Sequence, residues 1–274
     1  MFGEHPRRDG GRRRRAEYSL DSDTVLDRAP RDDSPRPTGF AASHPESPIT
    51  RGNIRCALPQ GEKVSALIRE RLPHVDGRED PDDALFRWIE AEAAMYRGWE
   101  DRKIAKRLRD GFVDSMGDPD VAVFRQFSMS IRQSRVSRAG GALQYHFREL
   151  LELAHIPFVM EPEIDGGEVP DFLFPSKQAY EDTDFPESKL RMLAAKFTAK
   201  DRWRQALNEA RRIRSKHLLT MEAGISVKQK RLMKNALLTL VLPKAVRDKY
   251  GADDQPDIMT VRFFLVHLEE VNVI

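Results

Sequence analysis

The sequence predicts a mixed α/β fold, in which a mainly helical first part precedes a central mixed sheet of about five strands flanked by helices. In residues 59–135, apolar side chains recur at spacings of three and four, which is typical of amphipathic helices. In residues 136–274, short apolar runs alternate with glycine turns and helical stretches. Residues 1–58 hold six of the 17 prolines and few large apolar residues, which predicts a mostly disordered Arg/Pro-rich tail.

The first part of the globular region is expected to consist of helices. Val64–Leu72 has helical spacing, and Asp80 followed by Pro81 is typical of a helix start, with the acid as cap and proline in the first turn. A wide apolar stripe follows and indicates a core helix. Lys103–Asp110 is expected to form a further helix, whereas Phe124–Ile131 fits either a strand or a helix.

The chain then changes from helical patterns to strands. Ser137–Gly141 is expected to interrupt the pattern before a helix over Ala142–Ala154. Phe158–Ile164 and Val169–Phe174 are expected to be short strands of a hairpin. Asp165-Gly166-Gly167 joins them and places glycine where a positive φ is needed.

Further buried strands are expected in the last third of the chain. Leu190–Thr198 has a nearly continuous apolar run, as do Leu237–Leu242 and Val261–His267. Between the first two, the spacing of apolar residues predicts a long helix that begins at Asp201 and carries His217 on its inner side.

Charge is distributed unevenly along the sequence. The net charge is only +2, but residues 196–249 contain 15 Lys or Arg against four acids, which indicates a polyanionic partner. The single cysteine, Cys56, excludes an internal disulfide framework and fits a reducing compartment. Because the sequence has neither a long apolar run nor a secretion signal, we expect a cytoplasmic protein without a membrane span.

Three residues suggest chemistry on a phosphodiester. Asp171 lies in an expected strand, Lys196 lies near the end of another, and Glu209 follows thirteen positions later in the expected helix. Carboxylate oxygens with waters are the usual ligands of Mg²⁺ at a phosphate-cleaving site. Such an ion lowers the pKa of a bound water and stabilises the charge that develops on phosphorus. Lys196 would hold the attacking water or the reacting phosphate.

Each of these residues also has a plain structural interpretation. The position two residues before Lys196, where a PD-(D/E)xK nuclease carries its second acid, is Ala194. Glu209 replaces it only if its helix packs back onto the lysine strand; otherwise Glu209 pairs with Arg212 on a charged helix surface. Lys196 alone fits a solvated strand end, and Asp171 alone fits a turn carboxylate.

Several segments together resemble one nuclease family. They are the stretch Leu85–Leu108, Ser137-Arg138-Ala139-Gly140, Pro170-Asp171-Phe172, Tyr180 and Lys196–Gln205, which reads KFTAKDRWRQ. Over residues 59–274 the sequence resembles the EcoRII-C-like type II restriction endonucleases, a displaced-acid branch of the PD-(D/E)xK superfamily. The resemblance implies a restriction-endonuclease-like sheet, a homodimer, Mg²⁺ and double-strand cleavage of DNA at a short palindrome related to CCWGG.

The resemblance also implies roles for individual residues. Asp171, Lys196 and Glu209 take the catalytic role, with Tyr180 nearby, although a loop aromatic that covers the core is the alternative for Tyr180. Asp171, Glu209 and Gln144 become metal ligands; Gln144 stands where the family pattern carries glutamate. The expected DNA contacts are Lys200, Asp201, Arg202, Arg204, Arg135 and Arg138.

Alternatives exist for the DNA contacts and for the activity. Asp201 also fits a helix cap, and Arg135 and Arg138 also fit a solvated loop. Because Gln144 lacks the charge of glutamate, the chain could also be a non-cleaving, sequence-specific DNA-binding protein of the same fold. A repair-type nicking endonuclease is a third possibility. The sequence contains no GxxxxGK[ST] loop, which argues against an ATP-driven enzyme.

Overall fold

The computed structural model of the protein describes residues 61–164, 166–199 and 202–272. These residues belong to one compact unit that runs from Arg55 to Ile274. The expected tail, residues 1–58, and two expected DNA contacts, Lys200 and Asp201, lie outside the described residues. Within the described ranges, no helix is both long enough and apolar enough to cross a lipid bilayer.

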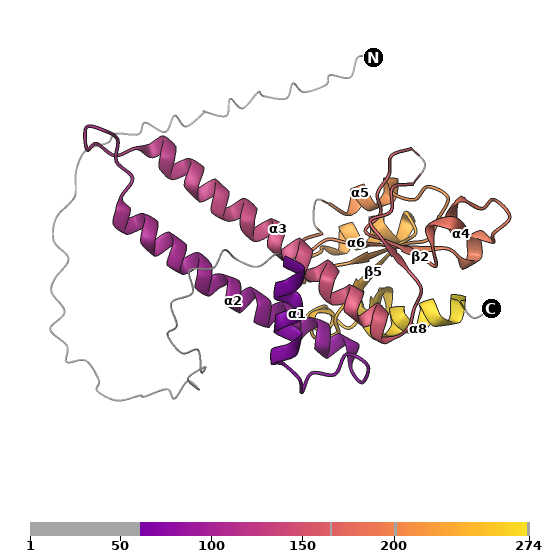
Figure 1. The fold of residues 1–274 in the computed structure, drawn as a ribbon. Helices are drawn as coiled ribbons and strands as arrows, with labels where there is room; N and C mark the ends of the chain where they lie inside the picture. Colours follow the sequence, from indigo (N-terminus) through magenta and orange to yellow (C-terminus); the bar gives the residue numbers. More distant parts are fainter. Residues whose placement is uncertain (1–60, 165, 200–201, 273–274) are drawn as a thin grey trace, which may run out of the picture. The chain divides into compact units, whose positions relative to one another are not determined.

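Helices and strands alternate after a purely helical beginning (Figure 1). The α-helices are α1 (Gly61–Arg71), α2 (Pro81–Asp110), α3 (Val121–Leu153), α4 (Lys177–Glu181), α5 (Trp203–Asn208), α6 (Val227–Asn235), α7 (Lys244–Arg247) and α8 (Val261–Asn272). The 3₁₀ turns are η1 (Glu187–Lys189) and η2 (Gln255–Asp257). The strands are β1 (Val159–Met160), β2 (Phe172–Phe174), β3 (Arg191–Ala195), β4 (Lys216–Leu219), β5 (Leu238–Leu242) and β6 (Ile258–Thr260).

The strands form one mixed sheet in the order β1-β2-β3-β4-β5-β6. The first three strands are antiparallel, and β3 to β6 are parallel. This confirms the predicted mixed α/β class, with six strands among the described residues instead of about five. The hairpin between β1 and β2 is present, and both Gly166 and Gly167 have positive φ (87° and 73°), as its turn requires.

The helical part contains fewer and longer helices than predicted. Asp80 caps α2 by accepting a hydrogen bond from the Asp83 N–H (3.2 Å), as expected. However, α2 continues through the separately predicted helix at Lys103–Asp110. Likewise, α3 runs unbroken through Ser137–Gly141, because α2 and α3 pack along each other. The cost of a helical glycine, about 1 kcal/mol, is smaller than the stabilisation from such packing.

The long helix predicted from Asp201 to His217 is wrong. Helix α5 ends at Asn208, and Ala210 adopts a positive φ of 48°, which turns the chain out of the helix. His217 lies instead in the fully buried strand β4, between β3 and β5. The apolar residues at helical spacing are buried, as predicted, but a turn and a strand bury them. A segment this rich in buried side chains can fill the middle of a sheet as well as the face of a helix.

The strand predicted at Val261–His267 is also wrong, since these residues begin α8. The buried residues in this helix are Val261, Phe264, Leu265 and Leu268, which follow helical spacing. Phe263 is apolar but 62 % exposed; it makes the sequence of Val261–His267 look like a continuous buried run, although only one face of the helix is buried. The sheet edge is formed by β6, which directly precedes α8.

The sheet separates two apolar cores. The first lies between the sheet and helices α1, α2, α3 and α8; the second lies between the sheet and α4 to α7. Along β3, Leu193 contributes to the first core and Ala194 to the second, as the alternation of a strand requires. By the same alternation Asp171 shares a side with Leu173 and Lys196 shares a side with Ala194. This is the side that α5 covers.

We expect His217 to make the fold sensitive to acid. Burial, together with the nearby charges of His267 and Arg191, lowers the pKa of the His217 imidazole to about 3. The folded protein therefore keeps this ring neutral while the unfolded chain takes up a proton below its ordinary pKa of about 6.5. Stability from this residue is complete above pH 6.5 and falls as the pH drops toward 3, by about 2 kcal/mol at pH 5.

The measurement is urea unfolding at pH 7 and pH 5 for the wild type and for His217→Leu. The variant should lose about 2 kcal/mol less between the two pH values. His74→Leu is the control, because His74 is exposed and should leave the pH dependence unchanged. An equal acid-induced loss in wild type and His217→Leu would contradict the assignment.

Candidate active site

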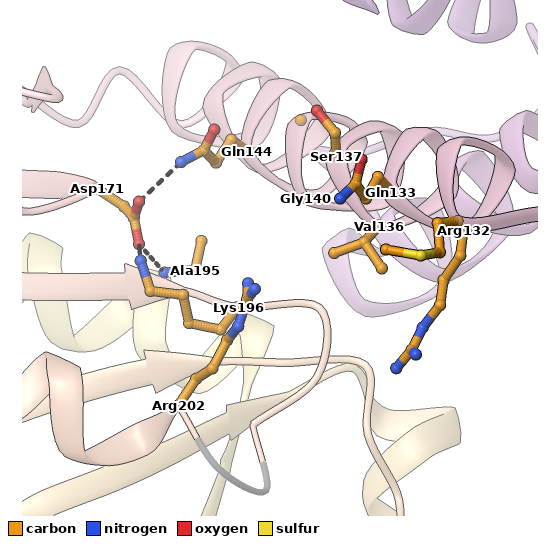
Figure 2. A pocket seen from close by; sticks show the side chains of 12 residues that line it. Arg132, Gln133, Val136, Ser137, Gly140, Gln144, Asp171, Ala195, Lys196 and Arg202 are labelled. Carbon is orange, nitrogen blue, oxygen red and sulfur yellow. Dashed lines mark hydrogen bonds and ion pairs between the residues drawn. The ribbon is translucent and has the colours of Figure 1, made fainter. Parts of the chain in front are cut away.

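Asp171 is held in place on both of its carboxylate oxygens. It immediately precedes β2 and is 7 % exposed. Its Oδ2 accepts hydrogen bonds from the Ala195 N–H (2.7 Å) and from Lys196 Nζ (2.6 Å). Its Oδ1 accepts one from Gln144 Nε2 (2.8 Å), and Figure 2 shows these contacts. The antiparallel pairing of β2 with β3 brings the start of one strand to the end of the other.

Glu209 reaches the same place from a different element. It is not inside the helix, as predicted, but directly follows α5 with an extended backbone (φ −83°, ψ 143°). Its Oε1 lies 3.9 Å from Lys196 Nζ, so the lysine stands between the two carboxylates. The alternative pairing with Arg212 is not observed. That guanidinium donates to backbone carbonyls, including that of Asp182 at 2.6 Å.

The surroundings of Glu209 favour its protonated form more than water does. Burial raises the pKa of the Glu209 carboxyl; the positive charge of Lys196 opposes this rise, and the negative charge of Asp171 adds to it. Its Oε2 is buried and has no hydrogen-bond partner among the described residues. A buried carboxylate oxygen without a partner is costly, which indicates that a further group completes this site.

The donor set fits a hard divalent cation. Asp171 and Glu209 offer carboxylate oxygens, the ligands that Mg²⁺ and Ca²⁺ prefer, and the unpartnered Oε2 of Glu209 is free to bind one. No group of three or more His, Cys, Asp or Glu side chains in the described ranges forms a complete cation site. Two protein ligands with waters or phosphate oxygens in the other positions remain an ordinary arrangement for Mg²⁺.

Gln144 is a hydrogen-bond donor in this structure, and its role as a metal ligand remains a prediction. Its amide nitrogen donates to Asp171 and lies 3.4 Å from Glu161 Oε1, so the amide links two carboxylates as a donor. Binding a cation requires the amide to rotate, so that Oε1 points inward. Glu161, which the sequence pattern did not single out, therefore belongs to the rim of this site. Glu161 has a positive φ of 49°, an unusual backbone conformation for glutamate that the sequence alone does not reveal.

A cavity of about 660 Å³ opens beside Asp171 and Lys196. One face of α3 forms its far wall, in a stripe that repeats every three or four residues from Met129 to Gln144. Arg132 and Arg202 also line this space, and Figure 2 shows both side chains pointing into it. The sequence did not single out Arg132, because only the packing of α3 against the strands next to Asp171 and Lys196 decides which arginine of α3 faces the cavity.

The predicted DNA contacts Arg135 and Arg138 are engaged elsewhere. Both guanidiniums pair with the buried carboxylate of Glu100, Arg138 at 3.1 Å, and Arg138 also lies 4.7 Å above the ring centre of Tyr96. They line a second cavity of about 370 Å³ on the α2 side of α3. Arg135 keeps 65 % of its side chain exposed, so a contact with phosphate remains a prediction for it.

Two other predicted residues lie beside the site. Tyr180 is buried in α4, and its hydroxyl accepts a hydrogen bond from the Arg212 N–H (3.4 Å), three residues after Glu209. It is not among the residues that line the cavity. Arg204 is exposed at the start of α5, and its guanidinium lies 4.6 Å from the ring centre of Trp203. Their roles in catalysis and DNA binding remain predictions.

Comparison with known proteins places this arrangement in a family. Residues 96–265, which include Asp171, Lys196 and Glu209, match the family described as EcoRII C terminal. The chain belongs to the EcoRII C-terminal family. It is 37 % identical over 206 residues to the type II restriction enzyme EcoRII of Escherichia coli, an alignment that covers 74 % of this chain and 50 % of that enzyme. The chain thus spans about half the length of this EcoRII relative.

Solved structures show the same fold for this EcoRII-C chain. Metal-depleted Ecl18kI in complex with uncleaved DNA superposes with a TM-score of 0.63 at 18 % identity, covering 79 % of this chain and 81 % of that one. The restriction endonuclease PspGI, in a complex with substrate DNA, gives a TM-score of 0.59 at 17 % identity, with coverages of 78 % and 92 %. These likenesses confirm a restriction-endonuclease-like fold.

Proposed function

We propose that this EcoRII-C protein is a type II restriction endonuclease that uses Mg²⁺ to cleave both strands of DNA. The observation that carries the proposal is the convergence of Asp171, Lys196 and Glu209 from three elements, with Lys196 Nζ 2.6 Å from one carboxylate and 3.9 Å from the other. Following the family resemblance, we also propose a homodimer and a short palindromic target related to CCWGG. The solved structures of Ecl18kI and PspGI are complexes of those enzymes with DNA.

Each residue of the site has a definable task in this proposal. Asp171, fixed by the Ala195 N–H, and Glu209 hold the cation, and Gln144 joins them if its amide rotates. The bound ion would lower the pKa of a water and stabilise charge on the reacting phosphate. Lys196 directs its ammonium toward the attacking water or the phosphate oxygen.

Arg202 and Arg132 face the same cavity and are the proposed DNA contacts of the described region. Arg202 lies just before α5, where a guanidinium can donate two hydrogen bonds to guanine in the major groove, a contact worth about 1–3 kcal/mol of discrimination. Lys200 and Asp201 are proposed to read the adjacent bases. Arg132, on α3 across the cavity, is proposed to contact a backbone phosphate beside the scissile bond.

Incubation of supercoiled plasmid with the full chain tests the proposal, with Mg²⁺ in one arm and EDTA in the other. Discrete linear fragments that require Mg²⁺ support it, and mapping their ends gives the target and the stagger. A gel shift without cutting would favour the non-cleaving DNA-binding protein, for which the Gln144 amide at Asp171 is the structural argument. Nicked circles alone would favour a nicking enzyme.

Arg132→Gln is expected to weaken DNA binding uniformly across sequences. Removal of one phosphate contact should lower the slope of log K against log salt by about one unit per protomer. Titration of a labelled duplex at several salt concentrations measures this slope. Arg125→Gln is the matched control, since Arg125 is exposed on α3 but does not line the cavity. Equal slopes for wild type and Arg132→Gln would remove Arg132 from the interface.

A further inference from the structure

Lys216 is a buried cation close to the candidate active site. It is the first residue of β4 and is 5 % exposed, and its backbone N–H donates to the carbonyl of Leu237 (2.9 Å), the residue just before β5. Burial lowers the pKa of its ammonium, while the charges of Glu168 and Glu209 oppose that effect. An ammonium in the interior is costly unless its hydrogens are satisfied, so the contacts of this side chain are informative.

The ammonium of Lys216 is directed at the turn that presents Glu209. Its Nζ donates to the backbone carbonyl of Glu209 and to that of Ala210, the latter at 3.1 Å. None of the ion pairs within the described residues joins Lys216 to a carboxylate at 4.0 Å or less. The ammonium thus holds two consecutive carbonyls in the turn that directly follows the carboxyl end of α5, where the negative end of the helix dipole also favours a cation.

The turn requires such support because its backbone is unfavourable. Ala210 has a φ of 48°, a left-handed conformation that costs a non-glycine residue about 1–2 kcal/mol. Ala210 is fully buried, so the conformation fixes which way Glu209 points. The Ile213 N–H donates back to the Ala210 carbonyl (2.9 Å), which therefore receives two hydrogen bonds. Without Lys216, a fluctuation of this turn would move the Glu209 carboxylate.

We propose that Lys216 is a positioning residue for the reaction: by holding the Glu209 and Ala210 carbonyls, it fixes the Glu209 carboxylate opposite Asp171 and Lys196. This inference rests on the proposed nuclease function. Lys216 itself touches neither DNA nor the reacting atoms, since it does not line the cavity. Its loss should therefore affect the chemical step more than the binding of DNA.

Lys216→Met tests the proposal, because methionine keeps the length of the side chain and removes its charge and donors. In single-turnover cleavage we expect the rate constant to fall about 100-fold, as a misplacement near 1 Å commonly causes, and the Kd for DNA in EDTA to stay within about threefold. Hydrogen exchange of the free protein, without DNA or metal, should become faster in peptides that contain Glu209–Ile213. Lys216→Arg, which restores charge and donors, should recover at least about tenfold of the lost rate.

Lys230→Met is the control for a purely structural effect. Lys230 has a side chain that is only 9 % exposed and is paired with Asp254 at 2.5 Å, but it lies on α6 away from the cavity. This variant should lose stability and keep both the cleavage rate and the exchange of the Glu209–Ile213 segment. If Lys216→Met does not fold, Lys216→Gln, which retains a donor for one carbonyl, takes its place with the same expectations.

Two outcomes overturn the proposal. One is a wild-type cleavage rate in the Lys216 variant; the other is a reduced rate with unchanged exchange in the Glu209–Ile213 segment. Failure of the proposed function has a different signature, because then the wild-type chain cuts no DNA. In that case the exchange comparison, which needs neither DNA nor metal, still decides whether Lys216 holds the turn.

Discussion

Replacement of Lys196 by methionine is expected to lower the rate of DNA cleavage by at least about 10³-fold, or about 4 kcal/mol of transition-state stabilisation. The ammonium lies 2.6 Å from Asp171 and 3.9 Å from Glu209, so it is the only charge that bridges both carboxylates in the described site. Methionine fills the same volume without charge. DNA binding should persist, because Arg132 and Arg202 still face the cavity.

The measurement is single-turnover cleavage of a labelled duplex with Mg²⁺, together with a gel shift in EDTA. Lys228→Met is the matched control, since Lys228 is an exposed lysine on α6 and is expected to change neither quantity. Loss of binding with residual cleavage in Lys196→Met would assign this lysine to DNA recognition and reject its role in chemistry.

Asp82→Ala is expected to cost about 3–5 kcal/mol of unfolding free energy, the largest effect on stability among the changes considered. Asp82 is 5 % exposed and accepts backbone N–H bonds from Lys244 (2.9 Å), Val261 (2.9 Å) and Arg262 (3.1 Å). These groups lie at the starts of α7 and α8, where helix N–H groups lack partners. Alanine leaves three buried or half-buried donors unsatisfied.

Burial raises the pKa of the Asp82 carboxyl, and the three N–H donors oppose the rise. Urea unfolding at pH 7 measures the loss of stability in Asp82→Ala. Asp83→Ala, at the neighbouring position, is the control. Asp83 has a side chain that is 44 % exposed and pairs with Arg87, 53 % exposed, one turn away, so its loss should cost no more than about 0.5 kcal/mol. Similar losses for both variants would show that Asp82 does not join α2 to α7 and α8.

Local sequence rules predicted the parts of the fold that local interactions determine. The cap at Asp80 and the glycine turn at Gly166-Gly167 follow from backbone preferences within a few residues, and the strand before Lys196 follows from its local apolar run. Tertiary packing decided the rest. Lys216–Leu219 forms a strand because it pairs with β3 on one side and β5 on the other. No local sequence pattern reveals these partners.

The same distinction applies to the site. Asp171 and Lys196 could be predicted, because their strands were identified correctly and adjacent strands bring their ends together. Glu209 was identified through the family resemblance. It was predicted to lie inside a helix, whereas it follows the end of α5. The partner of Arg138 could not be predicted, because Glu100 lies on another helix and only the packing of α2 on α3 brings the two together. Arg132 was missed for the same reason.

The unbroken course of α3 has a mechanical consequence. One rod of about 50 Å carries both the exposed turns near Val121 and the amide of Gln144 that touches Asp171. A load applied to the outer turns therefore either displaces that amide or flexes the rod at Gly140 and Gly141, its least stiff point. The helix thus connects its exposed outer turns mechanically to Asp171, the proposed catalytic carboxylate.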